Sequence, residues 1–287
     1  MSGKRPRDLP FSVIVVSYRA RELLERCLSS LSLTRIPHEA IVVDNASRDG
    51  SVELVRERFP GVLLLANEKN RGFGHACNQG LEVRRGRNVL LLNPDAALVN
   101  DVLAVAASAL ERRRDIGILG ARILDEDGCR QLSARSFPSH GTAFFHRYSL
   151  LTRLLPGNKG SRSYLGSDLP ERGDVVPVDW VSGAAMVLRD EAISALGGFD
   201  ERFFLYAEDT DLCLRARTAG FSVVYAPEAT VVHRIGGSSR KARPRALLER
   251  HRSMWRYYAK HYARSTVVDA ATCAGIVLRS ALAEARS

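Results

Sequence analysis

Four short, continuous apolar runs in the first hundred residues constrain the fold of this chain more than any other feature. They cover residues 13–16, 41–43, 62–65 and 89–92 and are rich in branched side chains. Such runs are typical of strands buried on both faces of a parallel sheet. Amphipathic stretches at helical spacing lie between them, with Leu24, Cys27, Leu28 and Leu31 as the clearest example. The sequence therefore predicts an α/β fold with a doubly wound, mostly parallel sheet flanked by helices.

Polar residues follow three of the four runs. In chain order they are Ser17 and Tyr18, then Asp44 and Asn45, and finally Asn93 and Asp95 on either side of Pro94. Each group alone is typical of a turn, but in open α/β sheets ligands bind outside the carboxyl ends of the strands. Three such groups at one edge predict a ligand site. Asp95 is the candidate metal ligand, because one carboxylate can hold a divalent cation whose other positions are filled by phosphates.

Residues 208–211, with the sequence EDTD, open a helix predicted over residues 208–219. Acidic side chains in a first turn also compensate the helix dipole. Helical spacing places Asp209 on the apolar side with Leu212 and Cys213, and Asp211 on the solvated side. A partly desolvated carboxylate is tuned toward a base. We therefore expect Asp209 to be a general base, with Glu208 as the alternative.

Further candidates lie outside these segments. His233 precedes the glycine-rich residues 236–239, so its imidazole suits a divalent metal and the following amides suit an anion. Trp180 has two open interpretations, packing against a sugar ring or burial in the core. Asn70 and Gly72 open a predicted helix that suits the lining of a nucleotide site. Because Cys77 replaces the third glycine of a dinucleotide-binding loop, a nicotinamide cofactor is not expected.

The chain beyond residue 100 has a less regular pattern. The predicted elements are a helix over 101–113 and strands over 116–123, 181–188, 222–225 and 230–232. Residues 133–172 are rich in Gly, Ser, Pro and Arg, which is typical of a binding loop.

Charge and cysteine content narrow the class of function. The formal net charge is +10, carried almost entirely by arginine, which favours anionic partners. No nucleic-acid recognition motif accompanies this charge, so nucleic acid is not an expected partner. Five cysteines without paired spacing predict reduced thiols in a cytosolic protein. The polar first ten residues do not resemble a signal peptide, and no apolar run is long enough to span a bilayer.

The C-terminal stretch, residues 240–287, is basic and has a helical pattern. Its cations Arg250, Arg252, Arg256, Lys260 and Arg264 alternate with Leu247, Leu248, Trp255, Tyr258 and Tyr262. This composition is typical of a helix at the surface of an anionic membrane. The alternative is a helix that covers the core and turns a basic face to solvent.

Seven segments of the sequence together resemble a known family, the inverting family 2 glycosyltransferases of GT-A fold. They are most similar to its rhamnosyltransferase-like branch. They are residues 15–18, 43–47, 70–80, 92–95, 197–200 and 208–211, and His233, in the order of the family. The resemblance covers residues 11–239. It implies a GT-A domain over 1–239, with a nucleotide-binding half at 11–100 and an acceptor and catalytic half at 101–239. Residues 240–287 would follow as a helical extension.

The resemblance also implies roles for individual residues. Ser17, Tyr18, Asp44 and Asn45 would surround the base and ribose of the donor, while Asn70, Gly72 and Asn78 would lie beside the donor. Asp209 would be the base, and His233 a contact on the metal side. Asp95 would be the surviving carboxylate of the D-x-D signature, whose first position here is the neutral Asn93.

The expected reaction is inverting transfer of a sugar, with rhamnose as one candidate. The donor would be dTDP- or UDP-linked, the acceptor a glycan or a lipid-linked glycan, and the cofactor Mg²⁺ or Mn²⁺. We expect a cytoplasmic enzyme, peripheral on the inner face of the cytoplasmic membrane. Two alternatives remain open. A sugar nucleotidyltransferase would need a glycine-rich, lysine-bearing loop where residues 17–20 read SYRA. A non-catalytic protein that binds anionic polymers or membranes would not bind a nucleotide sugar saturably.

Overall fold

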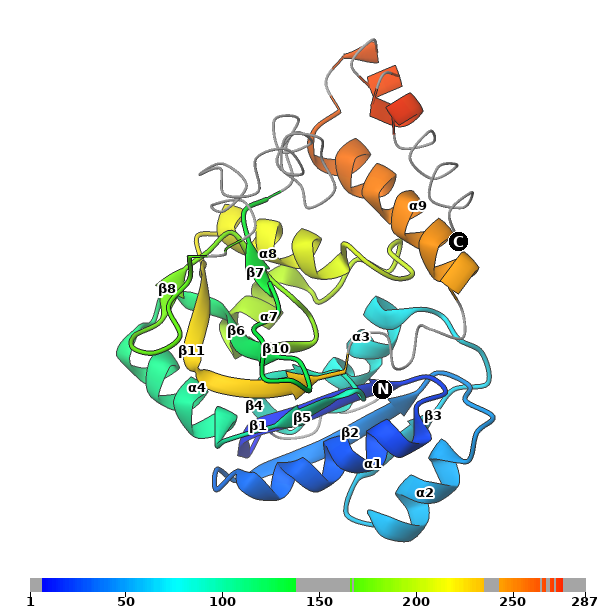
Figure 1. Ribbon diagram of the computed structural model, residues 1–287, viewed down its shortest axis with the longest axis vertical. Helices are drawn as coiled ribbons and strands as arrows, with labels where there is room; N and C mark the ends of the chain where they lie inside the picture. Colours follow the sequence, from blue (N-terminus) through cyan, green and yellow to red (C-terminus); the bar gives the residue numbers. More distant parts are fainter. Residues whose placement is uncertain are drawn as a thin grey trace.

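The computed structural model describes residues 7–137, 166, 168–234, 243–263, 265–266, 269–270 and 272–275. In this part of the chain, a nine-stranded mixed sheet lies between two layers of helices (Figure 1). Its strands are β1 (Leu9–Ser17), β2 (His38–Asp44), β3 (Leu63–Ala66), β4 (Gly86–Leu92), β5 (Ala96–Leu98), β6 (Ile116–Leu124), β8 (Val176–Pro177), β10 (Ala185–Leu188) and β11 (Ser222–His233). A separate two-stranded sheet pairs β7 (Ala134–Arg135) with β9 (Trp180–Val181).

The helices divide between the two faces of the large sheet. One face is covered by α1 (Arg21–Ser30), α2 (Ser51–Arg58) and α4 (Val102–Arg112), with the short 3-10 helix η1 (Leu31–Leu33) after α1. The other face is covered by α3 (Phe73–Val83), α7 (Asp190–Leu196) and α8 (Glu208–Thr218). The predicted α/β architecture with helices on both sides is confirmed.

The first half of the sheet is parallel, as predicted. The order β3-β2-β1-β4 brings four carboxyl ends to one edge, because Ser17 of β1 is in register with Asp44 of β2 and Asp44 with Ala66 of β3. On the other side, Val15 of β1 is in register with Leu92 of β4. The polar residues that follow β1, β2 and β4 therefore lie along the same edge.

Strand β1 shows why the apolar runs fold as buried strands. Val13 and Val15 pack with the helices of one face, whereas Ile14 and Val16 pack with those of the other. All four side chains are buried, and full burial of such a side chain contributes about 1.5–3 kcal/mol. An alternating strand would bury only one of these two faces.

The second half of the sheet is mixed. Strand β10 lies antiparallel between β4 and β6, β11 is parallel to β6, and the edge strand β5 is antiparallel to β11. The prediction of one strand over 181–188 is wrong. The backbone of residues 182–184 separates β9 from β10, since Ser182 N–H donates to Ser133 and the carbonyl of Ala184 accepts from Asn93 N–H.

The prediction of two short strands over 222–225 and 230–232 is also wrong in detail. A single strand, β11, spans both and changes register between Ala226 and Thr230. Pro227 lies in this interval, and a proline lacks the N–H group that a regular ladder needs.

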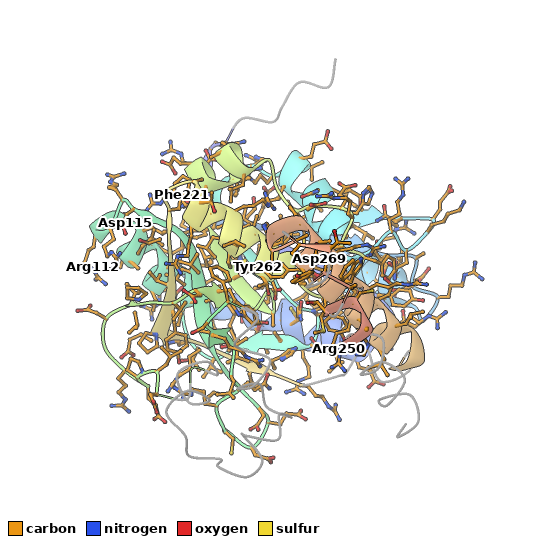
Figure 2. The ribbon with its side chains drawn as sticks, turned by 90° about the horizontal axis from the view of Figure 1, so that it is seen from above. Arg112, Asp115, Phe221, Arg250, Tyr262 and Asp269 are labelled. Carbon is orange, nitrogen blue, oxygen red and sulfur yellow. The ribbon has the colours of Figure 1, made fainter. Side chains whose placement is uncertain are left out.

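The C-terminal helix α9 (Arg243–His261) packs on the domain beside α8. Figure 2 shows it in orange, between the labels of Arg250 and Tyr262. The side chains of Tyr257 and Tyr258 are buried, and Ser253 Oγ donates a 2.9 Å hydrogen bond to the carbonyl of Leu205. Helix α9 therefore covers the core, the alternative that the sequence left open. Among the described helices, none is both long and apolar enough to cross a bilayer.

Candidate active site

Ser17 and Asp44 form a buried polar pair at the carboxyl ends of β1 and β2. Ser17 Oγ and Asp44 Oδ2 are buried and have no hydrogen-bond partner. Burial raises the pKa of Asp44, and this effect exceeds the opposing effect of the bonds from Ser47 to its carboxylate. Buried polar atoms without partners are rare in folded proteins, which makes these two atoms candidates for contact with a ligand.

The loops after these two strands are held in an uncommon backbone conformation. Arg19 and Ala46 both have positive φ values, 53° and 66°. Such strain costs on the order of 1–3 kcal/mol per residue and concentrates at functional sites. The half-buried ring of Tyr18 lies 5.1 Å below the Arg19 guanidinium, so Tyr18 is available at the surface of this pair of loops.

Asn45 connects the strand ends to the loop before α3. Its Nδ2 donates to the carbonyl of Gly72 at 3.1 Å, and Asn70 Oδ1 accepts from Gly72 N–H at 3.0 Å. Gly72 has a φ of 100°, and a Cβ atom there would lie 2.5 Å from the carbonyl oxygen of Phe204. The loop after β2 is thus hydrogen-bonded through Asn45 to the loop before α3, in which only glycine fits at position 72.

The side-chain amide of Asn78 bonds to the segment that precedes α8. Its Nδ2 donates to the carbonyl of Phe199 and to Glu201, and its Oδ1 accepts from Phe199 N–H at 2.8 Å. These bonds fix the turn after α7, on the same side of the sheet as Asn45 and Gly72. The expectation that Asn78 lies beside the donor stays a prediction.

Asp95 and His233 meet at the edge of the sheet. The pairing of His233 with Ala96 in β5 and β11 places Asp95 Oδ1 3.1 Å from His233 Nε2. Asp95 is buried, and its Oδ1 accepts no hydrogen bond. The contact is therefore an ion pair when the imidazole is protonated, and two converging lone pairs when it is neutral.

This pair fits a divalent cation. Two ligands on neighbouring corners of an octahedron with bonds of about 2.1 Å lie about 3.0 Å apart, close to the 3.1 Å between Asp95 Oδ1 and His233 Nε2. Among the described residues, no group of three or more His, Cys, Asp or Glu side chains converges as a metal site. A cation here would take its remaining ligands from a diphosphate and water, with the half-buried Asn93 beside it in sequence.

Asp209 is half-buried at the start of α8. Its Oδ2 accepts from Gly183 N–H at 3.0 Å, and its Oδ1 accepts from Thr210 N–H at 2.7 Å. Burial raises the pKa of Asp209, and its effect exceeds that of the two backbone bonds. Because Ala184, the neighbour of Gly183, also bonds Asn93, Asp209 lies close to the turn that carries Asp95.

Glu208 is more enclosed than Asp209. Its carboxyl group is buried with Oε2 unpartnered, and burial followed by the charge of Asp209 raises the pKa of Glu208 well above its ordinary value. Burial therefore favours the protonated form of Glu208. The two residues before it, Tyr206 and Ala207, have φ values of 70° and 65°. The acidic pair therefore directly follows a strained turn.

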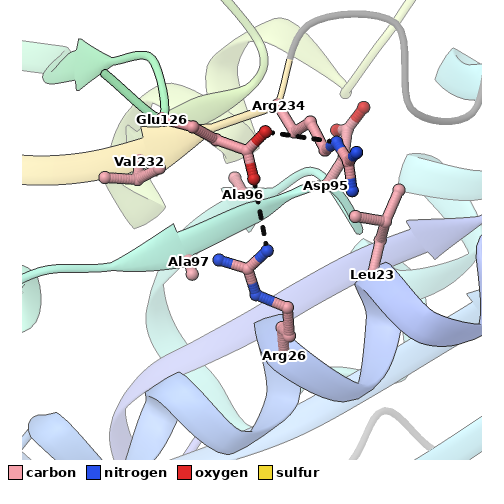
Figure 3. A pocket seen from close by; sticks show the side chains of 8 residues that line it. All are labelled: Leu23, Arg26, Asp95, Ala96, Ala97, Glu126, Val232 and Arg234. Atoms are coloured by element: carbon pink, nitrogen blue, oxygen red, sulfur yellow. Dashed lines mark hydrogen bonds and ion pairs between the residues drawn. The ribbon is translucent and has the colours of Figure 1, made fainter. Parts of the chain in front are cut away.

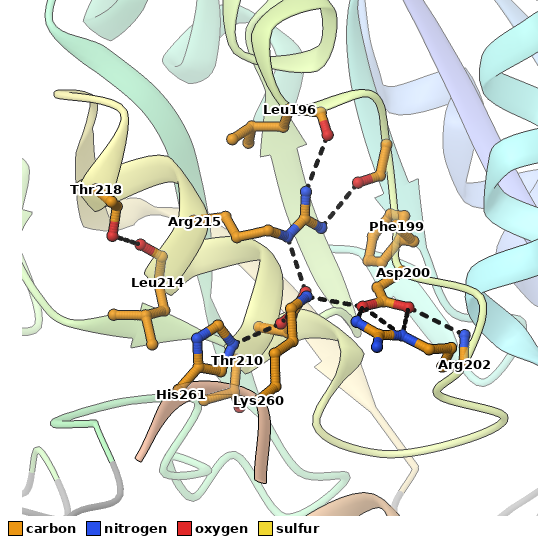
Figure 4. Close-up of polar contacts among 12 residues, drawn as sticks. Leu196, Phe199, Asp200, Arg202, Thr210, Leu214, Arg215, Thr218, Lys260 and His261 are labelled. Atoms are coloured by element: carbon orange, nitrogen blue, oxygen red, sulfur yellow. Dashed lines mark hydrogen bonds and ion pairs between the residues drawn. The ribbon is translucent and has the colours of Figure 1, made fainter. Parts of the chain in front are cut away.

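The prediction that Asp211 is solvated is wrong. Its side chain is fully buried and contacts Arg215 Nε at 2.8 Å, Lys260 Nζ at 2.6 Å and His261 Nε2 at 2.7 Å (Figure 4). Lys260 also binds Asp200 at 2.7 Å, so it does not point to a membrane as its place in the sequence pattern predicted. Helix α9 covers this face of α8, and no local pattern in α8 could show that.

Trp180 lies in β9 with its side chain half-buried. Its Nε1 donates to the carbonyl of Ser136 at 3.0 Å, and the Arg135 guanidinium lies 5.6 Å from its ring. These contacts satisfy the indole N–H within the protein. Packing of the Trp180 ring against a sugar stays a prediction.

The family described as "Glycosyl transferase family 2" matches residues 12–165, and "Glycosyl transferase family group 2" matches residues 89–264. The chain belongs to glycosyltransferase family 2. It is therefore an enzyme of the glycosyltransferase class, and the alternatives of a nucleotidyltransferase and a non-catalytic binding protein are set aside.

Two relatives of this glycosyltransferase share most of its length. It is 33% identical over 264 residues to the N-acetylglucosaminyl-diphospho-decaprenol L-rhamnosyltransferase of Mycobacterium tuberculosis (strain ATCC 25618 / H37Rv), covering 87% of this chain and 84% of the relative. It is 25% identical over 260 residues to rhamnosyltransferase WbbL of Escherichia coli (strain K12), covering 86% and 92%. The predicted rhamnosyltransferase-like branch is confirmed.

A solved structure shares its fold. The mannosyltransferase PcManGT from Pyrobaculum calidifontis, in complex with GDP-Man and Mn²⁺, superposes with a TM-score of 0.59 at 20% identity, covering 92% of this chain and 69% of that chain. This likeness confirms the GT-A fold of the glycosyltransferase.

Several residues of the candidate site had escaped the sequence analysis. Glu126 binds Arg26 at 3.4 Å and Arg234 at 3.2 Å, and all three line a small pocket with Asp95 (Figure 3). Gln131 bonds His233. Arg234 was within reach of sequence reasoning, because it directly follows His233. The others come from α1 and from the turn after β6, where no motif marks them.

Proposed function

We propose that this glycosyltransferase transfers a sugar, with inversion at the anomeric carbon, from a nucleoside-diphosphate donor to a lipid-linked or glycan acceptor. The observation that carries the proposal is the half-buried Asp209 carboxylate, whose pKa is raised and whose orientation is fixed by Gly183 N–H. The names of the two relatives support rhamnose as the sugar, and that of the mycobacterial relative supports a lipid diphosphate as the carrier of the acceptor.

Asp209 acts as the general base in this proposal. Oδ1 accepts from both Thr210 N–H and Thr210 Oγ1, whereas Oδ2 accepts only from Gly183 N–H and keeps a second lone pair. In the proposed step, this Oδ2 lone pair takes the proton of the acceptor hydroxyl as the hydroxyl oxygen bonds to the anomeric carbon. The bond from that carbon to the diphosphate oxygen breaks on the opposite side, and the nucleoside diphosphate leaves.

Asp95 and His233 would hold a divalent cation, Mg²⁺ or Mn²⁺. Bound there, the cation offsets the charge that develops on the leaving diphosphate. The Mn²⁺ in the mannosyltransferase of the same fold supports this assignment.

Ser17 and Asp44 would contact the base of the donor, with Tyr18 and Asn45 beside it. Their unpartnered atoms can accept hydrogen bonds from the N–H groups of a nucleobase. A dTDP- or UDP-linked sugar is the proposed donor, as the family resemblance implies. The loop of Asn70 and Gly72 closes this side of the site.

An anionic membrane surface is the proposed location of the acceptor. Helix α9 exposes Leu248, Arg250, Arg252 and Arg256. Glu249 contacts two of these three arginines. Because one carboxylate faces three guanidinium groups, the exposed side keeps a net positive charge. Cations beside an apolar side chain favour lipid headgroups. The free, buried thiols of Cys27, Cys77 and Cys213 favour the cytoplasmic face of that membrane.

A panel of nucleotide sugars tests the proposal. Binding of dTDP- and UDP-linked sugars is measured by calorimetry with Mn²⁺, and transfer to a synthetic lipid-linked acceptor is followed by NMR of the anomeric proton. We expect saturable donor binding and a product of inverted configuration. A product of retained configuration would exclude Asp209 as a base of single displacement.

A further inference from the structure

We propose that Gln131 is a positioning residue that fixes the tautomer of His233, so that the Nε2 lone pair faces the same point as Asp95 Oδ1. The inference rests on the proposed function in one respect, the cation between Asp95 and His233. In this proposal Gln131 acts through the imidazole of His233 and not by contact with the nucleotide sugar or the sugar acceptor.

Backbone pairing after β6 fixes the place of Gln131 beside His233. After β6 the chain makes a tight turn, in which Leu124 bridges to Arg130, and Gln131 N–H then donates to the carbonyl of Ile123 at 2.8 Å. Strand β11 pairs with β6 on this side, with Val232 in register with Leu124. Gln131 is thus anchored to β6 while its side chain reaches the end of β11.

Hydrogen bonds determine which way the Gln131 amide faces. Its Nε2 donates to the carbonyl of His233 at 2.6 Å and lies 3.4 Å from the carbonyl of Leu124. The reverse orientation would turn the amide oxygen toward two carbonyl oxygens, which cannot donate. The amide oxygen, Oε1, therefore lies 3.0 Å from His233 Nδ1.

This orientation sets the proton on the imidazole. An amide oxygen only accepts hydrogen bonds, so Nδ1 must be the protonated nitrogen. In the neutral ring the lone pair is then on Nε2, 3.1 Å from the buried Asp95 Oδ1, which has no hydrogen-bond donor. Two acceptors that converge at this distance are satisfied by a cation between them. Ligating histidines generally bond an acceptor through the other ring nitrogen in this way.

Removal of the Gln131 acceptor should reverse the tautomer. Without Oε1, the ring loses the acceptor that holds its proton on Nδ1, and the Asp95 carboxylate 3.1 Å from Nε2 favours a proton there. A proton on Nε2 removes the lone pair that the cation needs. Gln131→Leu therefore replaces the cation site with a protonated Nε2 beside Asp95.

The tautomer is read directly by NMR. Long-range ¹H–¹⁵N spectra of ¹⁵N-histidine-labelled, metal-free protein distinguish Nδ1–H from Nε2–H, and His233→Gln identifies the signal. At pH 8, where an ordinary histidine is neutral, we expect Nδ1–H in the wild type and in Gln131→Glu, which keeps an acceptor. Gln131→Leu should show Nε2–H. An Nε2–H wild type, or a Gln131→Leu variant that keeps Nδ1–H, would overturn the proposal.

Metal affinity supplies the second readout. Free Mn²⁺ is measured by electron paramagnetic resonance in the presence of protein and nucleoside diphosphate. We expect Gln131→Leu to weaken Mn²⁺ binding about 10–100-fold. Thr230→Val is the matched control, because it removes a side-chain bond from Arg122 on the same strand pair and should leave Mn²⁺ binding unchanged. Unchanged Mn²⁺ binding in Gln131→Leu would overturn the positioning role.

Failure of the cation site itself gives a different result. If Asp95→Ala retains wild-type Mn²⁺ affinity while Gln131→Leu reverses the tautomer, the cation assignment of the proposed function is wrong and Gln131 still sets the imidazole proton. If Asp95→Ala loses Mn²⁺ binding and Gln131→Leu keeps the wild-type tautomer, the cation assignment stands and Gln131 does not set the imidazole proton.

Discussion

Asp209 Oδ2 accepts a 3.0 Å hydrogen bond from the backbone N–H of Gly183. This bond joins the start of α8 to the break between β9 and β10, and it is possible because the backbone of residues 182–184 has left the sheet. The carbonyl of the next residue, Ala184, accepts from Asn93 N–H. The break in the strand therefore connects the candidate base to the turn that carries Asp95 through two hydrogen bonds, one to the Asp209 side chain and one between backbone groups.

The first prediction concerns the base. Asp209→Asn should lower kcat by about 10²–10⁴-fold, the usual contribution of a general base, because the amide keeps the shape and cannot take a proton. Donor affinity should stay within a few-fold. Glu208→Gln is the matched control and should retain most transfer, because burial favours the protonated form of Glu208 and the neutral amide resembles that form. If the two variants exchange these behaviours, Glu208 is the base.

The second prediction concerns the cation. Asp95→Ala should weaken donor binding at least about tenfold in Mn²⁺ or Mg²⁺ and have little effect in EDTA, because the carboxylate acts through the metal. Calorimetric titration of both proteins in the three conditions measures this. Equal donor affinity in all six titrations would remove Asp95 from the metal site.

The third prediction concerns the pH dependence of stability. Burial raises the pKa of Glu208 above its unfolded value of 4.5, so the folded state binds the extra proton. As pH rises above about 4.5, ionisation of the unfolded state progressively reduces the free energy of unfolding. The Glu208→Gln variant has no ionisable group at this position, so its free energy of unfolding does not fall in this way. Its stability relative to wild type should grow between pH 5 and pH 8, measured by urea unfolding, and a constant difference over this range would contradict the burial effect.

The fourth prediction concerns the contact of α9 with α8. Asp211→Asn should lower the free energy of unfolding by about 3–5 kcal/mol, because the cationic side chains of Arg215 and Lys260 lose a buried counter-charge. Asp174→Asn, at an exposed carboxylate 3.9 Å from Arg112, should cost less than about 1 kcal/mol. A similar small cost at both sites would mean that the Asp211 cluster adds no stability.

The fifth prediction concerns the membrane. Truncation before α9 would remove packing as well as charge, so the test needs intact helices. Replacement of Arg250, Arg252 and Arg256 by Gln should abolish cosedimentation with anionic liposomes at low salt, at about 1 kcal/mol per cation. The control replaces Arg56, Arg87 and Arg112, also exposed, with the same change in net charge. Equal binding of the two triple variants would exclude a specific role for α9.

The parallel half of the fold was predictable from the sequence for a physical reason. A strand buried on both faces must be apolar at every position, so the runs around Val13 and Val89 could not fold as surface strands. Their aligned ends then placed Ser17, Asp44 and Asp95 at one edge.

The rest depended on contacts between distant segments. Helical spacing placed Asp209 on the apolar side of α8, where the structure has it half-buried against Gly183, but it could not show that α9 would cover Asp211. The break before β10 has no sequence signature of its own, because Ser182 and Gly183 fit a strand or a turn. Gln131 escaped notice because its function comes from the strand beside it and not from its neighbours in sequence.

The place of β10 in the sheet has a consequence for synthesis of the chain. Strand β4 pairs with β1 on one side and with β10 on the other, and β10 begins only at Ala185. While the ribosome makes the residues between them, the unit of β1 to β4 has an unpaired, apolar edge at β4. Open edges of this kind pair with other chains. A nascent or prematurely terminated chain that ends before Ala185 is therefore the form of this protein most prone to aggregate.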